Sequence, residues 1–566
     1  MIALAAIATL AAAPVACPPT LQALAERAWD LRARTMPFSS DDIPRLERPP
    51  GLVRSWSRKS VEQQRVEWAA LRACLRRLPE AGLPVPLRVD RRLIGSLFAR
   101  VEWELDVNRR WERDPTFYLE QTLTPVLELL VQPPPIDELR ARELLSRLRN
   151  VPALTADGKE NLRGGVRRFA QLALDSLQEI RPKLQRVESG VAPLLPPSVP
   201  RAELVQAIDS AASALESYRA FLESRSNQMV AKASVGRAGY EFFLRHIALV
   251  PYTPEQLIAM AQQEWERSVT AEALEQQRNS GAPPLAYFGT ADEQIARSAK
   301  DELSIRKFLG ERSILSVPAS VRHYTVQPIP GYLDALGDFG EQDFFTGPSA
   351  LDQDAVRYLY PPSPKLGYFG RANARDPRPV LTHEGVPGHY FQLALSWTHP
   401  DPIRRHYYDS GANEGLGFYA EEMMMQAGLY DDSPRSREII WGLNRLRAAR
   451  VYVDVQLALG NLTLEQAAQF LADRAPMDPR TARNEAASFS TNPGQAMTYQ
   501  IGKLQIEKFL AESRFRQGEN FDLRKFHDAL WLNGNVPIAL QRWEALGDDD
   551  EIRRLDAGAE APVQRH

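Results

Sequence analysis

Apolar residues recur at three- and four-residue spacing along most of this chain, and this periodicity constrains the fold more than any other feature of the sequence. It is clear in residues 61–78 and 93–111, where the apolar residues stand among Arg and Glu. Such spacing places apolar side chains on one face of an α-helix. Another helix start is marked at residues 253–256, TPEQ, by an N-cap Thr, a Pro in the first helical position and a Gln that completes a capping box. The sequence therefore predicts a mainly α-helical protein.

Four prolines interrupt the helical pattern in residues 187–200, VESGVAPLLPPSVP. A helix interior does not tolerate so many prolines, and 566 residues exceed the size at which one compact core keeps growing. We therefore place a lobe boundary there. The predicted units are an N-terminal helical lobe (17–190), a second helical lobe that carries the motif described below (201–550) and a loose tail (551–566).

Strand-like segments are few. Residues 323–328, with alternating Tyr and Val, and residues 365–372 are the best candidates. We expect them to form a small β-sheet beside the functional site.

Charge and composition exclude two classes of protein. Lys and Arg number 69 and Asp and Glu 72, so the net charge of -3 provides no field suited to nucleic acid. The composition, 44% hydrophobic and 25% charged, is that of a folded globular chain, and we expect no integral membrane span.

The first 16 residues form an Ala-, Ile- and Leu-rich run that ends in small residues and Pro, a pattern typical of an export signal. The run is too short to span a bilayer, and it lacks the usual Lys or Arg. We expect export to the periplasm or medium. Lipid attachment at Cys17 is the less favoured alternative, since Pro14 stands where a lipobox normally has Leu. With only Cys17 and Cys74, we expect neither a disulfide framework nor a Cys-based metal site.

Two of the eight histidines bracket the seven residues HEGVPGH, His383 to His389. The known zinc pattern HExxH places two His four residues apart on one helical face, with a Glu beside the first as general base. Here the spacing is six, which on an unbroken helix leaves the two imidazoles roughly 120° apart around the axis. Pro387 and Gly388 are residues that interrupt helices. We predict a break there, with His389 beginning a new helix, so that both imidazoles converge on one metal ion.

A catalytic zinc ion generally has three protein ligands and an open position, so two histidines leave it one ligand short and we expect a carboxylate nearby. The segment NEGLGFYAEEMM supplies Glu414 and, seven residues later on the same helical face, Glu421. We predict that Glu414 is the third ligand and that Glu421 hydrogen-bonds a ligand imidazole. Glu384 would be the general base that deprotonates the activated water. The alternative is that the two histidines are ordinary surface residues or satisfied core residues.

Three segments, HEGVPGHYFQ, EGLGFYAEE and PGQAMTYQIGK, resemble the signatures of the bacterial domain of unknown function family 885. The resemblance spans most of the chain and is strongest over residues 358–543. That family is similar to zinc peptidases of the thimet oligopeptidase and Taq carboxypeptidase kind. The resemblance implies a two-lobed, metallopeptidase-like helical architecture with a deep central channel, a small sheet near the active site and one Zn²⁺ ion.

In those peptidases the ligand Glu follows the second His by about 25 residues and another Glu follows seven later, as Glu414 and Glu421 follow His389 here. Two features depart from the pattern: the lengthened first motif, and Leu416 where Trp is usual. Those peptidases also have a tyrosine that stabilises the tetrahedral intermediate, and Tyr499 in PGQAMTYQ matches it. Alternatively, Tyr499 is a core aromatic residue with a satisfied hydroxyl group.

Four further residues are weaker candidates for substrate binding. Lys503, one helical turn beyond Tyr499, could meet a substrate carboxylate or could be a solvated lysine. His527 could line the cleft or be structural. Tyr368 and Asn373, in KLGYFGRAN, would lie on an edge strand that hydrogen-bonds an extended peptide, with a connecting loop as the alternative.

These observations predict an exported zinc-dependent hydrolase that cleaves the peptide bonds of short peptides. One alternative is a metallohydrolase of a non-peptide amide, such as an acyl-amino acid or a cell-wall fragment. Another is a catalytically inactive, metal-containing binding protein, although such a protein has no use for a general base beside the first ligand. The sequence carries no signal for an oligomeric state.

Overall fold

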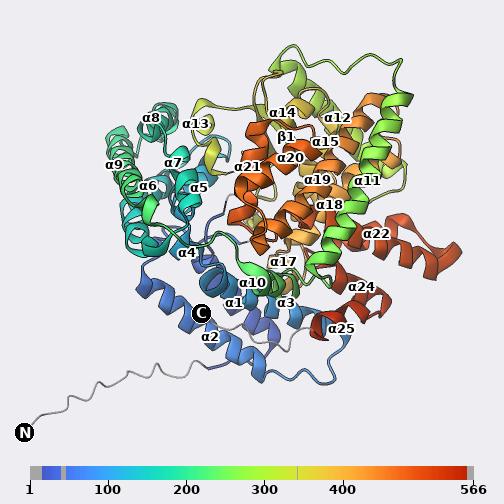
Figure 1. Ribbon diagram of the computed structural model, residues 1–566, viewed down its shortest axis with the longest axis horizontal. Helices are drawn as coiled ribbons and strands as arrows, with labels where there is room; N and C mark the ends of the chain where they lie inside the picture. Colours follow the sequence, from blue (N-terminus) through green and yellow to red (C-terminus); the bar gives the residue numbers. More distant parts are fainter. Residues whose placement is uncertain (1–15, 40–45, 341, 558–566) are drawn as a thin grey trace, which may run out of the picture.

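The protein is mainly α-helical, as predicted, with one small sheet (Figure 1). The computed structural model describes residues 16–39, 46–340 and 342–557. The signal-like residues 1–15 and the last nine residues of the predicted tail lie outside this range. Within it, no helix is both long and apolar enough to cross a membrane.

The N-terminal helices share one hydrophobic core, in which their apolar faces meet. Helices α5 to α9 form a bundle on one side of the molecule, and α1 to α3 lie below it (Figure 1). Their bounds are α1 Leu21–Thr35, α2 Arg58–Arg77, α3 Val85–Glu102, α4 Arg110–Arg113, α5 Pro115–Leu130, α6 Glu138–Asn161, α7 Arg167–Ser176, α8 Ile180–Val191 and α9 Arg201–Arg225.

The proline-rich segment 187–200 begins in the last turn of α8, and its residues 192–200 connect α8 to α9; these two helices pack against each other. Val187 of α8 and Leu204 of α9 belong to the same buried cluster. The predicted lobe boundary at this segment therefore does not coincide with a change of core, and α9 belongs with the N-terminal bundle.

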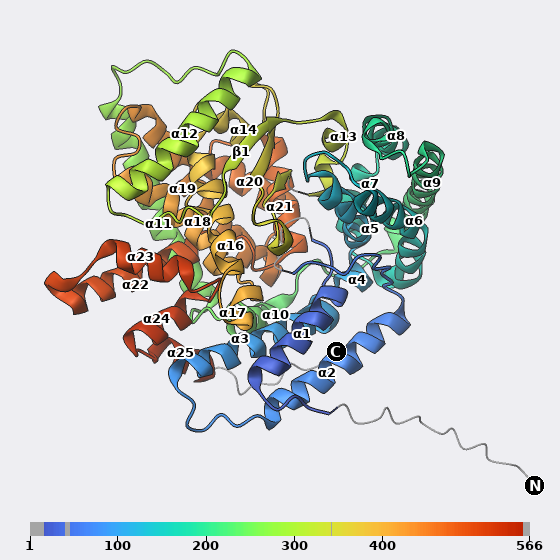
Figure 2. The same cartoon turned by 180° about the vertical axis from the view of Figure 1, so that it is seen from behind.

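The remaining helices form the larger part of the molecule, where α11 packs along α19 and α18 packs along α22. Figure 2 shows α16 on the reverse side, and it contacts α17, α18 and α23. The bounds are α10 Gly236–Phe242, α11 Pro254–Arg278, α12 Ala291–Glu311, α13 Gly331–Asp334, α14 Tyr368–Asn373, α15 Arg378–Val380, α16 His389–Trp397, α17 Pro402–His406, α18 Ser410–Gln426, α19 Pro434–Leu459, α20 Leu464–Arg474, α21 Pro479–Thr491, α22 Thr498–Gln517, α23 Leu523–Leu532, α24 Ile538–Leu546 and α25 Asp550–Ala557.

The sheet has the strand order β1-β3-β2, with β1 Tyr324–Pro328, β2 Asp343–Phe344 and β3 Ala355–Leu359. β1 runs parallel to β3, and β2 runs antiparallel to it with Asp343 opposite Arg357. The predicted strand at residues 323–328 is thus confirmed. The one predicted at residues 365–372 is wrong, because α14 occupies most of it. Tyr368 and Phe369 both pack against the cluster of α19 to α21, whereas in a strand these neighbours would point to opposite faces.

Two predictions for the ends of the chain are corrected. Residues 551–557 are not a loose tail but part of α25, whose Ile552 and Leu555 are buried in the core of the N-terminal helices. The sequence predicts no disulfide framework, but its two cysteines do pair: Cys17 and Cys74 form one disulfide, which ties the segment before α1 to α2. A sulfur atom in a disulfide cannot also carry a lipid.

Candidate metal centre

The chain turns sharply between the two histidines of HEGVPGH. A single turn of π-helix covers Leu381–Gly385, Val386 is extended, and α16 begins at His389. Gly388 is required in the turn, because a Cβ atom there would overlap the carbonyl oxygen of His383. The indole Nε1–H of Trp531 donates a hydrogen bond of 2.7 Å to the carbonyl oxygen of Pro387 and ties the turn to α23. The predicted helix break is confirmed.

This turn brings His383, His389 and Glu414 together. One ligand atom from each lies within 4.8 Å of the other two. Oε2 of Glu414 is 3.1 Å from Nε2 of His389 and 3.5 Å from Nε2 of His383. All three side chains are buried. Two imidazoles and one carboxylate around a point are a donor set that suits zinc and leaves a fourth position for water or substrate.

Glu421 lies beside His383. The same face of α18 carries Glu421 and Glu414. Its Oε1 atom is 2.7 Å from Nδ1 of His383, and its side chain is fully buried. A carboxylate in this position keeps the proton of the ring on Nδ1 and leaves Nε2 available to a metal. The structure therefore places Glu421 where the sequence predicted an imidazole partner.

Neighbouring charges shift the protonation of the centre. Burial lowers the pKa of His383, but Glu414 and Glu421 outweigh this effect and raise it to about 9. Burial acts to raise the pKa of Glu414, yet the two histidines hold it well below its usual range. In the metal-free protein His383 is therefore protonated at neutral pH, and an incoming metal ion would displace that proton.

Glu384 is partly exposed and faces the small sheet. Its Oε1 atom is 3.8 Å from Nη1 of Arg357 on β3, and the same nitrogen is 2.6 Å from Oδ2 of Asp343 on β2. Arg357 lines a cavity of about 300 Å³ together with Asn373, one of the weaker substrate-binding candidates. Arg357 and Asp343 were not found from the sequence, because only the register of β2 and β3 places them opposite each other.

Tyr499 also lies at the centre. Its ring is nearly parallel to that of His383, with an interplanar angle of 10° and centroids 6.1 Å apart. The guanidinium groups of Arg447 and Arg450 lie 5.8 and 4.8 Å from the centroid of the Tyr499 ring.

The three other weak candidates lie elsewhere. Lys503 is completely buried and contacts Glu422, so it is neither solvated nor placed to meet a substrate. His527 has the structural role given as its alternative, with Nε2 2.9 Å from the hydroxyl of Tyr419 and Nδ1 2.8 Å from a backbone carbonyl. Tyr368 lines a separate cavity of about 440 Å³.

Two glycines of α18 make room for the centre. A Cβ atom on Gly417 would lie 3.0 Å from Cε1 of His389 and 3.1 Å from Cε1 of His383. A Cβ atom on Gly415 would lie 2.7 Å from the backbone of Gly502, where α18 crosses α22. The two glycines of EGLGFYAEE, Gly415 and Gly417, are the sequence signal for this close packing.

Comparison with known proteins gives a family and a fold. A model of the family described as "Bacterial protein of unknown function (DUF885)" matches residues 48–543. Two solved structures, both described as putative lipoproteins, are similar at 17% sequence identity. The one from Shewanella oneidensis, of unknown function, has a TM-score of 0.70 and covers 94% of this chain and 100% of its own. The one from Colwellia psychrerythraea has a TM-score of 0.73 and covers 95% and 99%.

At this identity the two structures establish a shared fold only. No curated protein matches the chain. The family match, in contrast, extends over most of the sequence and includes every residue of the candidate metal centre. The chain belongs to the DUF885 family of bacterial proteins.

Proposed function

We propose that this protein is an exported, zinc-dependent hydrolase that cleaves the peptide bonds of short peptides. The observation that carries the proposal is the convergence of His383, His389 and Glu414, with Glu384 directly after the first ligand. Three protein ligands are the usual complement of a catalytic zinc, whereas a structural zinc is usually closed by four. The carboxylate of Glu384 is partly exposed, as a general base that must reach water and substrate has to be.

The residues have distinct tasks in this proposal. Zinc would supply a Lewis acid that makes water acidic and polarises the scissile carbonyl. Glu384 would accept the proton of the attacking water and deliver it to the leaving amine. Tyr499 would donate its hydroxyl proton in a hydrogen bond to the developing oxyanion. Glu421 would keep the His383 ring in the orientation that presents Nε2.

The cavities of the molecule support an extended, polar substrate. Three of them, of about 300, 620 and 820 Å³, all include Gly337 in their lining. They run from Arg357, beside Glu384, to Lys183 of α8 and Arg110 in the N-terminal bundle, and charged side chains lie along their walls. We take them as parts of one channel between two helical lobes, which is the architecture of the zinc peptidases that the sequence resembles.

Export is supported by two independent features. The first 16 residues resemble an export signal. The Cys17–Cys74 bond also fits export, because disulfides form and persist in oxidising compartments outside the cytosol. The similar solved structures are described as "putative lipoprotein", but the disulfide occupies the sulfur atom that a lipid would need here. We therefore favour a periplasmic or secreted protein without a lipid anchor.

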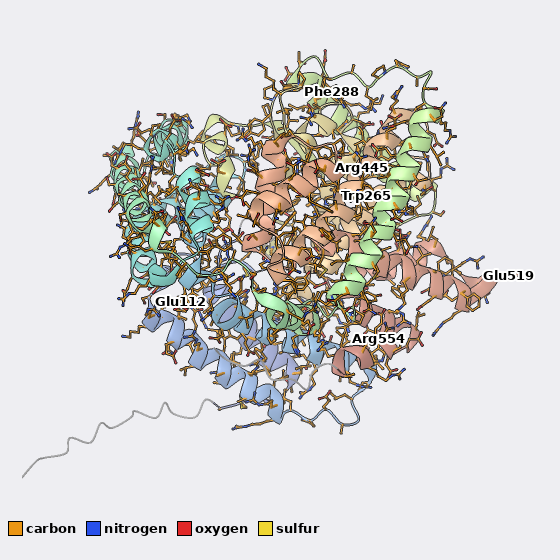
Figure 3. All side chains as sticks on the ribbon, viewed as in Figure 1. Glu112, Trp265, Phe288, Arg445, Glu519 and Arg554 are labelled. Carbon is orange, nitrogen blue, oxygen red and sulfur yellow. A yellow bond between two sulfur atoms is a disulfide. The ribbon has the colours of Figure 1, made fainter. Side chains whose placement is uncertain are left out.

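The proposal is tested by incubating the zinc-loaded protein with a mixed peptide library and with acylated amino acids, and by comparing wild type with Glu384→Gln. We expect peptide cleavage by wild type, and normal zinc binding with turnover reduced by about 10² to 10⁴-fold in the variant, since general-base catalysis contributes this much. Glu519→Gln, at the exposed tip beyond α22 (Figure 3), is the matched control and should cleave like wild type. Equal turnover by Glu384→Gln would refute the mechanism, and cleavage of acylated amino acids alone would move the substrate class to other amides.

A further inference from the structure

A buried arginine stands behind Glu421. Arg447, on α19, is 5% exposed, and its Nη2 atom is 3.2 Å from Oε1 of Glu421. This is the same oxygen atom that lies 2.7 Å from Nδ1 of His383. A chain of three side chains from α19, α18 and the HEGVPGH turn therefore ends on a candidate metal ligand.

Aromatic rings fix the position of the arginine. The Arg447 guanidinium lies 5.5 Å from the ring centroid of Phe418, 5.6 Å from that of Phe369 and 5.8 Å from that of Tyr499. At such distances a cation is attracted to the ring face. Since Tyr499 in turn stacks on His383, Arg447 lies beside two of the residues that flank that imidazole, Glu421 and Tyr499.

Charge explains why an arginine is needed. Glu421 is fully buried, and a buried carboxylate is costly unless it is paired. Within the part of the chain that the structure describes, Glu421 is the only carboxylate that forms an ion pair with Arg447. The positive charge of Arg447 therefore compensates that of Glu421, and the carboxylate can remain in place beside the imidazole.

We infer that Arg447 is a positioning residue of the metal centre, which acts through Glu421 to hold the His383 ring with Nε2 facing the metal. The inference rests on the proposed zinc site but adds a residue that neither the motif nor the spacing identified. Arg447 touches neither metal nor substrate. A group that contacts a metal ligand directly, as Glu421 does, typically changes metal affinity by about 10 to 100-fold when replaced, and Arg447 acts one contact further out.

The experiment measures zinc affinity by competition with a chromogenic chelator, which requires no substrate. We expect Arg447→Met to bind zinc about tenfold more weakly than wild type, the lower end of the range for a group that contacts a ligand directly. Arg447→Lys should recover part of the loss, because it restores the charge but not the planar donor group. The matched control is Arg445→Met. Arg445 lies two residues earlier on α19 (Figure 3) and pairs with Glu272 of α11 at 3.0 Å, so its replacement should leave zinc affinity unchanged.

A double-mutant cycle separates action through Glu421 from a general effect on packing. In a Glu421→Gln background, Arg447→Met should cause little further loss of affinity, because the carboxylate through which it acts is gone. The inference is overturned if the loss is undiminished in that background, or if Arg447→Met binds zinc like wild type. Absence of zinc binding by the wild-type protein is a different result, which would overturn the proposed function and the inference together.

Discussion

Reduction of the Cys17–Cys74 disulfide should lower the free energy of unfolding by up to about 4 kcal/mol. The bond joins residues 57 apart in sequence, the first just before α1 and the second buried in α2. Closing a loop of that length removes about 14 cal/mol/K of entropy from the unfolded chain, or about 4 kcal/mol at 25 °C. Cys17 and Cys74 also pack with the N-terminal core, so the loss should fall on the unit that contains α1 to α3.

Urea unfolding followed by circular dichroism, with and without reductant, measures this difference. The control is Cys17→Ala combined with Cys74→Ala. Its unfolding should not respond to reductant, so any effect of the reductant on wild type belongs to the cross-link. The small cavity left at the buried Cys74 position affects the variant equally under both conditions. The reasoning is refuted if wild type unfolds at the same urea concentration in both conditions while a thiol assay shows that both cysteines are free.

Three further outcomes follow from the centre and its surroundings. Gly417→Ala should weaken zinc binding in a chelator competition, because the new methyl group lies 3.0 Å from the ring of His389; unchanged affinity would show that the rings can shift. Zinc affinity should rise about tenfold per pH unit from pH 6 and level off near pH 9. Burial lowers the pKa of His383, but Glu414 and Glu421 raise it to about 9. Below that pH zinc must displace a proton from His383. A pH-independent affinity would contradict this. Lys503→Met should destabilise the protein by about 3 to 5 kcal/mol in thermal unfolding, because it removes the buried cation that pairs with Glu422. A smaller loss would mean that Arg267, the other cation paired with Glu422, compensates its charge alone.

Local sequence rules were enough for several parts of the fold and the site. The helix start at Thr253 has the predicted capping box, in which the Thr253 and Gln256 side chains each accept a hydrogen bond from the other residue's backbone N–H. The break before His389 follows from the backbone limits of Pro387 and Gly388, which act on neighbouring residues only. Glu421 could be placed because a fixed helical spacing relates it to Glu414.

Other features depend on contacts between distant segments, which one sequence does not reveal. Arg357 faces Glu384 only because β3 pairs with β2 and lies beside the HEGVPGH turn. The sequence predicts that Lys503 either meets a substrate carboxylate or is solvated, yet packing of α22 against α18 and α11 buries it among carboxylates of the protein. Arg447 is 26 residues from Glu421, and only the packing of α19 against α18 brings them together.

The most direct test of the account is the amount of zinc bound per chain, measured by elemental analysis after dialysis against zinc buffered at a low free concentration. We expect one zinc ion per chain for wild type and for Glu384→Gln, and a marked loss for His383→Ala, His389→Ala and Glu414→Ala. Wild-type protein without zinc, or undiminished zinc in all three ligand variants, would contradict the claim that His383, His389 and Glu414 form one metal centre.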